Sequence, residues 1–189
     1  MAKTALKAVK VAPEIKLDLG CGKNKKEGFT GVDQRKFEGV DVVLNLLKAP
    51  WPWKSGSVAE IHMSHAMEHF GGKDRVQIVN EMYRVMRVGA KATIATPYWA
   101  SGRAYGDFTH QWPPVCEMWY QYLNKKWREE NAPDNDIKWN PDGYSCDFEC
   151  TGGYALHPVF VPKNQDAQQF ATQFNKEAVQ DMTWTMVNK

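Results

Sequence analysis

Short apolar runs, separated by turns and by one amphipathic stretch, restrict the fold of this chain more than any other feature. Each run has the length of a buried strand, and such strands are predicted at residues 15–19, 29–32, 40–44, 58–63 and 92–96. Between the last two runs, apolar residues recur at helical spacing, with Asp74 placed to begin a helix and Gly89 placed to end it. A strand followed by a helix and another strand is a βαβ unit, which predicts a parallel sheet.

The remainder of the chain adds two strands and a helix. Strands are predicted at residues 147–151 and 182–187, and a helix at 165–175. We therefore predict an α/β, Rossmann-like fold with a twisted, mostly parallel sheet of about seven strands and helices on both faces. Only about ten residues join the first two strands, whereas a parallel crossover normally needs about a dozen or more. Either the connecting helices are reduced to turns, or one of these strand predictions is wrong.

Aromatic residues are concentrated in one segment after the fifth predicted strand. Five of the eight tryptophans lie between Trp99 and Trp139, and prolines in the same segment interrupt any long helix. We interpret residues 98–146 as an insertion or cap over one end of the sheet. Its aromatic side chains form either the core of the cap or a platform for a planar or cationic substrate. With 189 residues, the chain is expected to form a single domain that begins with a basic arm at residues 1–14.

The charge and hydropathy of the chain exclude some functions. With 24 basic and 22 acidic residues, the formal charge of +2 does not indicate strong binding to duplex nucleic acid. No apolar run approaches the ~20 residues of a membrane span or forms a signal sequence, so we expect a cytoplasmic protein without membrane contact. The four cysteines include no C-x-x-C pair, which favours reduced thiols. The sequence does not indicate an oligomeric state.

The segment DLGCG at residues 18–22 begins within the first predicted strand and continues into the turn after it. A glycine pair at this point lets the backbone turn sharply and approach a ligand closely. A dinucleotide site would require a third glycine, where this chain has Lys25, and an acidic residue about 20 positions further on. The acidic residue here is Asp33, which comes sooner and is suited to accept hydrogen bonds from two ribose hydroxyls. These features predict a nucleoside ligand without a diphosphate, and S-adenosyl-L-methionine fits that description.

Several segments together resemble the motifs of the class I S-adenosylmethionine-dependent methyltransferases. Residues 18–22 resemble the first motif, 31–33 the ribose-binding acid, and 40–46 the third strand beside adenine, although Asn45 stands where many members have aspartate. Residues 57–70 resemble the fourth strand and the following turn, with its Ser-His-x-x-Glu-His sequence. The resemblance implies that S-adenosyl-L-methionine is the cofactor and that it is bound by Asp18, Gly20, Cys21, Gly22, Asp33, Gln34, Asn45, Leu46, Ser64 and His65.

Histidines and a glutamate in the turn after the fourth strand allow two interpretations. His65, Glu68 and His69 match H-x-x-E-H, the zinc-binding pattern of the inverted zinc peptidases, and the two histidines would share one face of a helix. The methyltransferase resemblance instead places this turn near the methionine half of the cofactor and requires no metal. The resemblance extends to residues 107–110, where Phe108 replaces a proline of the family segment.

Candidate catalytic bases lie in the same turn and in the loop after the fifth strand. A base must remove the proton when a methyl group is transferred to a hydroxyl or an amine, and histidine suits this role at neutral pH. The candidates are His110, and then His69 with Glu68 to orient it. Glu68 has the alternative role of a capping or pairing residue at a helix start. We predict a methyltransferase for an unidentified oxygen or nitrogen nucleophile. The alternatives are a non-catalytic protein that binds S-adenosylmethionine or S-adenosylhomocysteine, and the zinc peptidase.

Overall fold

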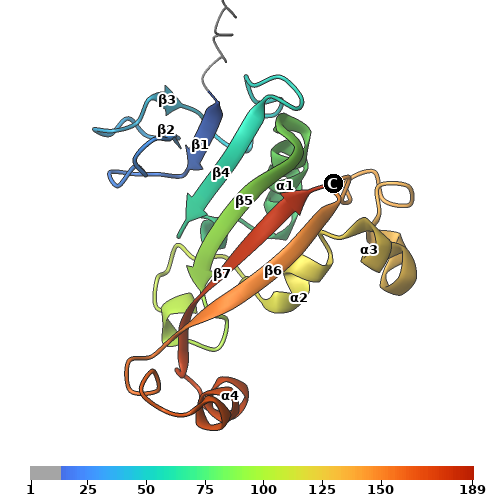
Figure 1. Ribbon diagram of the computed structural model, residues 1–189. Helices are drawn as coiled ribbons and strands as arrows, with labels where there is room; N and C mark the ends of the chain where they lie inside the picture. The colour runs from blue at the N-terminus through green and yellow to red at the C-terminus, as the bar shows by residue number, and fades with distance from the viewer. Residues whose placement is uncertain (1–13) are drawn as a thin grey trace, which may run out of the picture.

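Seven strands form one sheet in the computed structural model, which describes residues 14–189. The spatial order is β3-β2-β1-β4-β5-β7-β6 (Figure 1). Strands β1 to β5 pair in parallel, whereas β7 is antiparallel to both β5 and β6. The predicted α/β fold with a mostly parallel sheet is therefore confirmed. The strands are β1 (Ile15–Leu19), β2 (Thr30–Asp33), β3 (Val42–Val43), β4 (Val58–Ser64), β5 (Met86–Pro97), β6 (Phe148–Leu156) and β7 (Val179–Asn188).

The connections between the first strands are turns. Residues 20–29, 34–41 and 44–57 contain no helix, so the strand predictions hold and the crossover helices are reduced to turns. Of the predicted basic arm, only residue 14 lies within the described part of the chain. The helices are η1 (Met67–His69), α1 (Gly72–Val85), η2 (Gly102–Ala104), α2 (Glu117–Gln121), α3 (Lys125–Asn131), η3 (Pro133–Asn135) and α4 (Gln165–Phe174).

The end of α1 differs from the prediction that Gly89 ends this helix. The helix ends at Val85 and β5 begins at the next residue. Gly89 lies inside β5 with a φ of +78°, a conformation that glycine adopts without steric cost. The pairing of β5 with β4 shifts register in this region, between Val58 and Glu60 of β4. A glycine in a left-handed conformation serves a helix end or a strand irregularity equally well, so the sequence pattern did not separate the two.

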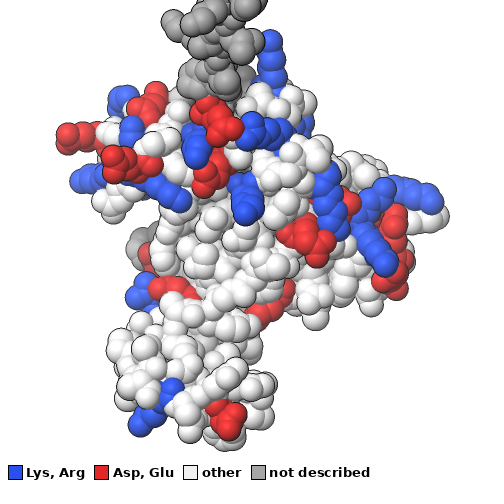
Figure 2. Space-filling model, viewed as in Figure 1, with Lys and Arg blue, Asp and Glu red and all other residues white. Residues whose placement is uncertain are grey.

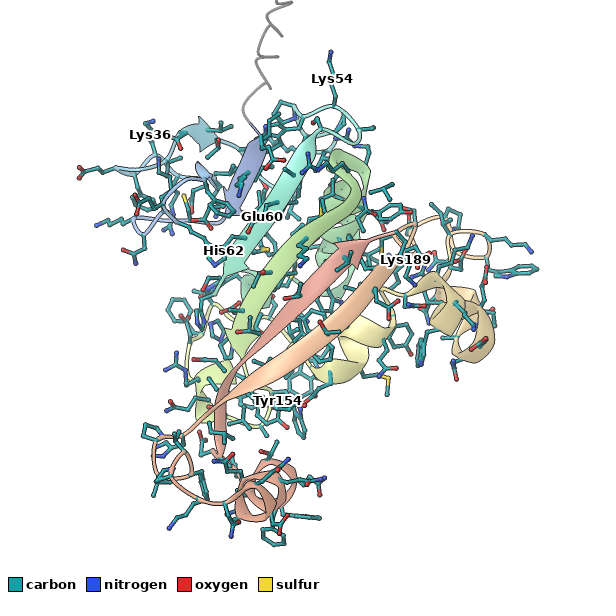
Figure 3. All side chains as sticks on the ribbon, in the orientation of Figure 1. Lys36, Lys54, Glu60, His62, Tyr154 and Lys189 are labelled. Atoms are coloured by element: carbon teal, nitrogen blue, oxygen red, sulfur yellow. The ribbon has the colours of Figure 1, made fainter. Side chains whose placement is uncertain are left out.

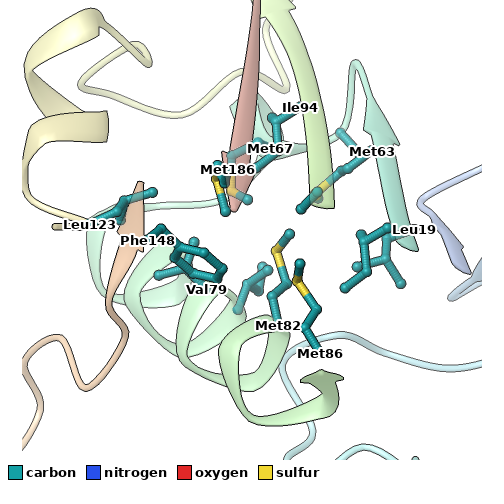
Figure 4. Packing of buried hydrophobic residues seen from close by; sticks show 14 of the residues in the cluster. Leu19, Met63, Met67, Val79, Met82, Met86, Ile94, Leu123, Phe148 and Met186 are labelled. Carbon is teal, nitrogen blue, oxygen red and sulfur yellow. The ribbon is translucent and has the colours of Figure 1, made fainter. Parts of the chain in front are cut away.

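The hydrophobic core lies between the sheet and the helices α1 and α2, which cover one face of it (Figure 1). On α2, the ring of Tyr120 stacks on Trp184 of β7, with the ring centroids 4.4 Å apart. Burial of this apolar surface is the main source of stability for the fold. Figure 4 shows side chains of α1 meeting those of the central strands, among them the buried residues Met63, Val79, Met82, Ile94 and Met186.

The opposite face of the sheet carries polar side chains, and no helix within residues 14–189 covers it. Glu60 and His62 of β4 lie on this face (Figure 3), and Lys16 of β1 pairs with Glu60 at 2.9 Å. At the centre, Thr93 of β5 lies opposite Thr185 of β7, and both are half-buried. Helix α4 lies beyond the end of the sheet (Figure 1). The prediction of helices on both faces is therefore wrong, because the connections that would have carried the second set of helices are turns.

The aromatic-rich segment, residues 98–146, contains both buried and exposed rings. Tyr120 and Tyr144 are buried and belong to the hydrophobic core. In contrast, Phe108, Trp112 and Trp139 are largely exposed. The segment therefore contributes to the core through α2 and the chain before β6, while its loops carry apolar side chains at the surface.

Charged residues of both signs are intermixed on the surface. Figure 2 shows basic and acidic side chains side by side around β1 to β3 and around α3, with mostly uncharged residues over the lower half of this view. This distribution agrees with the small formal charge of +2. Within residues 14–189, each helix is too short or too polar to cross a membrane.

Candidate active site

A cleft of about 490 Å³ opens where β1, β2 and β4 end at their carboxyl termini, the usual ligand position in open α/β sheets. We call it the first cleft. The turns that follow the strands form its wall, so residues from distant parts of the sequence meet there. Of the predicted cofactor residues, those that line it are Gly20, Gly22, Asp33, Gln34, Asn45, Leu46 and His65.

The turn after β1 depends on its two glycines. Gly20 and Gly22 have φ values of +69° and +54°, in the left-handed region that other residues avoid. A Cβ atom on Gly20 would lie 2.6 Å from the Cβ of Ala66, which comes from the turn after β4. The backbone N–H of Gly20 donates to the carbonyl oxygen of Val32 at 2.8 Å. The turn after β1 and the turn after β4 can therefore approach each other only because residue 20 has no side chain.

Asp33 ends β2 and holds the glycine turn from the other side. One carboxylate oxygen accepts a hydrogen bond from the backbone N–H of Gly22 at 3.0 Å, and the other accepts from Arg35 N–H at 2.8 Å. The residue is buried, with 8% of its surface exposed. Because each carboxylate oxygen has a second lone pair, Asp33 keeps the capacity to accept hydrogen bonds from a ligand in the cleft.

The turn after β3 is fixed by hydrogen bonds of its own. The side-chain oxygen of Asn45 accepts from the backbone N–H of Leu47 at 2.9 Å. The carbonyl oxygen of Leu46 accepts from the indole N–H of Trp51 at 3.0 Å. These bonds set the conformation of the segment predicted to lie beside adenine.

Three of the predicted cofactor residues, Asp18, Cys21 and Ser64, do not line the first cleft. Asp18 is 2% exposed, and its carboxylate bonds to the backbone N–H of Lys26 at 2.7 Å and to Nδ1 of His62 at 2.8 Å. It therefore fixes the loop that carries the glycines. Burial raises the pKa of the Cys21 thiol, which stays protonated at neutral pH. Ser64 is the last residue of β4.

The turn after β4 contains a strained residue, His65, whose φ is +50°. Its Nδ1 lies 3.3 Å from Oε1 of Glu68, and the hydrogen bond to Glu68 raises the pKa of His65. Because His65 lies outside the short helix η1, it does not share a helix face with His69, and that prediction is wrong. The structure also pairs Glu68 with His65, whereas the sequence predicted that Glu68 orients His69.

A second cleft of about 620 Å³ adjoins the first at His65 and His69, which line both. Its remaining wall is formed by the end of β5 and the loop after it. The ring of His110, from that loop, lies 4.9 Å from the ring of His69, measured between centroids. The predicted catalytic residues Glu68, His69 and His110 all line the second cleft. The structure therefore brings the three together beside the first cleft.

Hydrogen bonds join the loop after β5 to the turn after β4. The backbone N–H of Gln111 donates to the carbonyl oxygen of Glu68 at 2.8 Å. The hydroxyl of Thr109 lies 3.0 Å from Nδ1 of His69 and 2.6 Å from Oδ1 of Asp107. Hydrogen bonds from Thr109 lower the pKa of Asp107, so this carboxyl is ionised at neutral pH. His69 is thus held in place by a connected polar network, and Nδ1 of His110 lies 3.2 Å from the carbonyl oxygen of Ala104 in the same loop.

Solved structures with a similar fold are methyltransferases. An S-adenosylmethionine-dependent methyltransferase from Archaeoglobus fulgidus matches with a TM-score of 0.65 over 93% of this chain and 86% of its own, at 16% sequence identity. A geranyl diphosphate C-methyltransferase from Streptomyces coelicolor A3(2), in complex with Mg²⁺, geranyl diphosphate and S-adenosyl-L-homocysteine, gives 0.53 over 93% and 71%, at 14% identity. The chain has the class I methyltransferase fold. No protein-family model and no curated protein sequence matches it.

Both clefts also contain lining residues that were not predicted from the sequence. Arg35 and Phe70 line the first cleft, and Arg103 lines the second. Arg35 comes two residues after Asp33 at the tip of β2, and this position at a strand end was a usable signal. Arg103 and Thr109 lie in the loop after β5, whose path depends on contacts with other parts of the chain. No short sequence pattern predicts such a path.

Proposed function

We propose that this protein is an S-adenosyl-L-methionine-dependent methyltransferase that acts on an oxygen or nitrogen nucleophile. The observation that carries the proposal is the first cleft, where the glycine turn, Asp33 and the turn after β3 meet at the carboxyl edge of the sheet. Asp33 accepts hydrogen bonds from the ribose hydroxyls, and Asn45 and Leu46 lie beside adenine. The methionine half extends past the glycine turn toward His65. The fold shared with methyltransferases supports the same assignment.

Two joined clefts suit a transfer between two bound molecules. The cofactor occupies the first cleft and the acceptor the second, so they meet beside His65 and His69. A lone pair of the acceptor forms a bond to the methyl carbon as the carbon–sulfur bond breaks, and the sulfonium becomes the neutral thioether of S-adenosylhomocysteine. The acceptor proton passes to Nε2 of His110 when this residue acts as the base. Correct placement of the two molecules supplies most of the rate enhancement.

Cofactor binding is tested by thermal unfolding and calorimetry with S-adenosylmethionine and S-adenosylhomocysteine. Ligand at one hundred times its Kd adds about 2.7 kcal/mol, which raises the Tm by about 5 to 10 °C for a domain of this size. Asp33→Asn should weaken binding at least tenfold, because an amide has one acceptor oxygen where the carboxylate has two. Asp41→Asn is the matched control, since Asp41 also accepts a backbone N–H but does not line the cleft. If neither S-adenosylmethionine nor S-adenosylhomocysteine binds, the proposal is excluded.

Turnover is tested by measuring S-adenosylhomocysteine release with a panel of hydroxyl and amine acceptors. We expect His110→Ala to lose methyl transfer and to keep cofactor binding, because His110 lines the second cleft and not the first. Unchanged turnover in this variant would remove His110 from the mechanism. If the cofactor binds but no acceptor in the panel leads to release of S-adenosylhomocysteine, the non-catalytic alternative is favoured instead.

A further inference from the structure

Glu68, His69 and His110 form a cluster at the junction of the two clefts. Each offers one ligand atom, a carboxylate oxygen or a ring nitrogen, and the three atoms all lie within 4.8 Å of one another. Glu68 and His69 belong to η1, and His110 comes from the loop after β5. This set differs from the H-x-x-E-H pattern, because His110 takes the place of His65. Two imidazoles and one carboxylate are a common ligand set for divalent transition metals.

Hydrogen bonds determine which nitrogen of each ring carries a lone pair. The hydroxyl proton of Thr109 is directed to Asp107, so the Thr109 oxygen accepts from Nδ1–H of His69. In His110, Nδ1–H donates to the carbonyl oxygen of Ala104 at 3.2 Å. In their neutral forms, both rings therefore have the lone pair on Nε2. Histidines that bind metals usually donate the other N–H to a carbonyl or carboxylate in this way, which orients the ring and fixes the tautomer.

The carboxylate of Glu68 has an oxygen without a hydrogen-bond partner. Glu68 is 5% exposed, and within residues 14–189 its Oε2 is buried and accepts no hydrogen bond. A buried, unpaired carboxylate oxygen is costly, and a bound water or cation would relieve that cost. Burial lowers the pKa of the nearby Arg75, and the charge of Glu68 acts against this shift. Nη1 and Nη2 of Arg75 donate to the carbonyl oxygens of Pro113 and Gln111, and within residues 14–189 its buried Nε, like Oε2 of Glu68, has no hydrogen-bond partner.

We propose that Glu68, His69 and His110 bind one divalent transition metal cation, for which Mn²⁺ and Zn²⁺ are suitable probes. Imidazole ligands favour Zn²⁺ over Mg²⁺ and Ca²⁺, which prefer oxygen ligands, and Mn²⁺ serves as the paramagnetic probe of the same site. Three protein ligands leave coordination positions open, as in catalytic metal sites. All three residues line the second cleft, so the open positions face the space assigned to the acceptor. The carboxylate of Asp107 borders the same space, 3.9 Å from Nε2 of His110.

The cation would also define the class of acceptor. The acceptor binds through an oxygen atom, such as a hydroxyl, which becomes more acidic when it is bound to a cation. This part of the proposal rests on the methyltransferase function, whereas metal binding itself does not. The metal role and the base role exclude each other at His110, because a lone pair that is donated to a cation cannot accept a proton. The acceptor proton would instead pass to the carboxylate of Asp107, which lines the same cleft. In this arrangement, His69 and His110 act on the acceptor through the metal.

The test is a titration of chelator-treated protein with Mn²⁺ and with Zn²⁺, followed by calorimetry and, for Mn²⁺, by electron paramagnetic resonance. We expect one ion per chain. Glu68→Gln and His110→Ala should each weaken binding at least tenfold, and Thr109→Val should weaken it about 10- to 100-fold by releasing the His69 ring. His157→Ala is the control, because His157 lies between β6 and α4 and does not line either cleft. Circular dichroism verifies that each variant is folded.

The outcomes separate the two proposals. Binding of neither ion, or binding that Glu68→Gln and Thr109→Val leave unchanged, would overturn the metal site. Equal losses in His157→Ala and in the cluster variants would also overturn it. The same preparations are titrated with S-adenosylmethionine. Cofactor binding without metal binding overturns only the metal site, and metal binding without cofactor binding overturns only the methyltransferase.

Discussion

Replacement of Gly20 by alanine tests the reason why the turn after β1 contains glycine. At a φ of +69°, a residue with a side chain costs about 1 to 2 kcal/mol. The new Cβ would lie 2.6 Å from the Cβ of Ala66, whereas carbon atoms normally stay about 3.5 to 4.0 Å apart, and such overpacking costs about 1 to 3 kcal/mol. Reduced entropy of the unfolded chain returns about 0.4 to 1 kcal/mol. We expect Gly20→Ala to lower the free energy of unfolding by about 2 to 4 kcal/mol in total.

Gly22→Ala is the matched control for this prediction. Gly22 also has a positive φ, but a Cβ on it would meet no atom within 4 Å. Gly22→Ala should therefore lower the free energy of unfolding by about 1 kcal/mol or less, through the backbone conformation alone. Urea unfolding at constant m-value measures both free energies, and the Tm values should differ by about 4 to 8 °C. Equal losses in the two variants would show that the approach of the two turns does not determine the need for glycine at residue 20.

Two further predictions concern stability away from the clefts. Hydrogen bonds from Arg84 lower the pKa of the Glu81 carboxyl in the folded protein. The ionised carboxyl therefore stabilises the fold at pH values above its unfolded pKa of about 4.3. This contribution is lost as the pH falls through the lower pKa of the folded state. Between pH 7 and 3.5, the free energy of unfolding of the wild type should fall by up to about 1 kcal/mol more than that of Glu81→Gln, because one carboxyl with an unfolded pKa of about 4.3 takes up at most one proton on unfolding over this range; parallel pH profiles in urea unfolding would contradict this. Gly152→Ala should cost about 1 to 3 kcal/mol because its Cβ would overlap the indole of Trp184. Gly153→Ala, with no atom nearby, should be neutral, and similar losses would refute the steric argument.

The sequence predicted the strands and the first cleft because their signals are local. Each strand is a short apolar run, and in a parallel sheet the residues that follow such runs meet at one edge. Gly20, Asp33 and Asn45, which line one cleft, could therefore be placed at the same edge of the sheet without knowledge of their contacts. The predicted end of α1 was wrong because Gly89 has a left-handed conformation, which occurs both at helix ends and at strand irregularities.

The geometry of the second cleft could not be predicted from the sequence, because it depends on contacts between distant segments. His110 was proposed as a catalytic residue, but its contact with His69 follows from the path of the loop after β5. That path is fixed by Thr109 bonding to His69 and by Gln111 bonding to Glu68. The contact of Glu68 with His65 was also not predicted, since the left-handed conformation of His65 has no signature in residue type.

The polar face of the sheet makes this protein a convenient scaffold for chemical attachment. Thr93 and Thr185 pair with each other at the centre of the sheet, and Thr93 also pairs with His62, which lies on the polar face (Figure 3). They line neither cleft, and their neighbours on that face are side chains of other strands. A cysteine introduced at either position would carry a fluorophore or a surface linker without disturbing the core. Cys21 and Cys146 are buried, whereas Cys116 and Cys150 are half-buried like Thr93 and Thr185, so selective labelling of the new thiol requires replacement of Cys116 and Cys150.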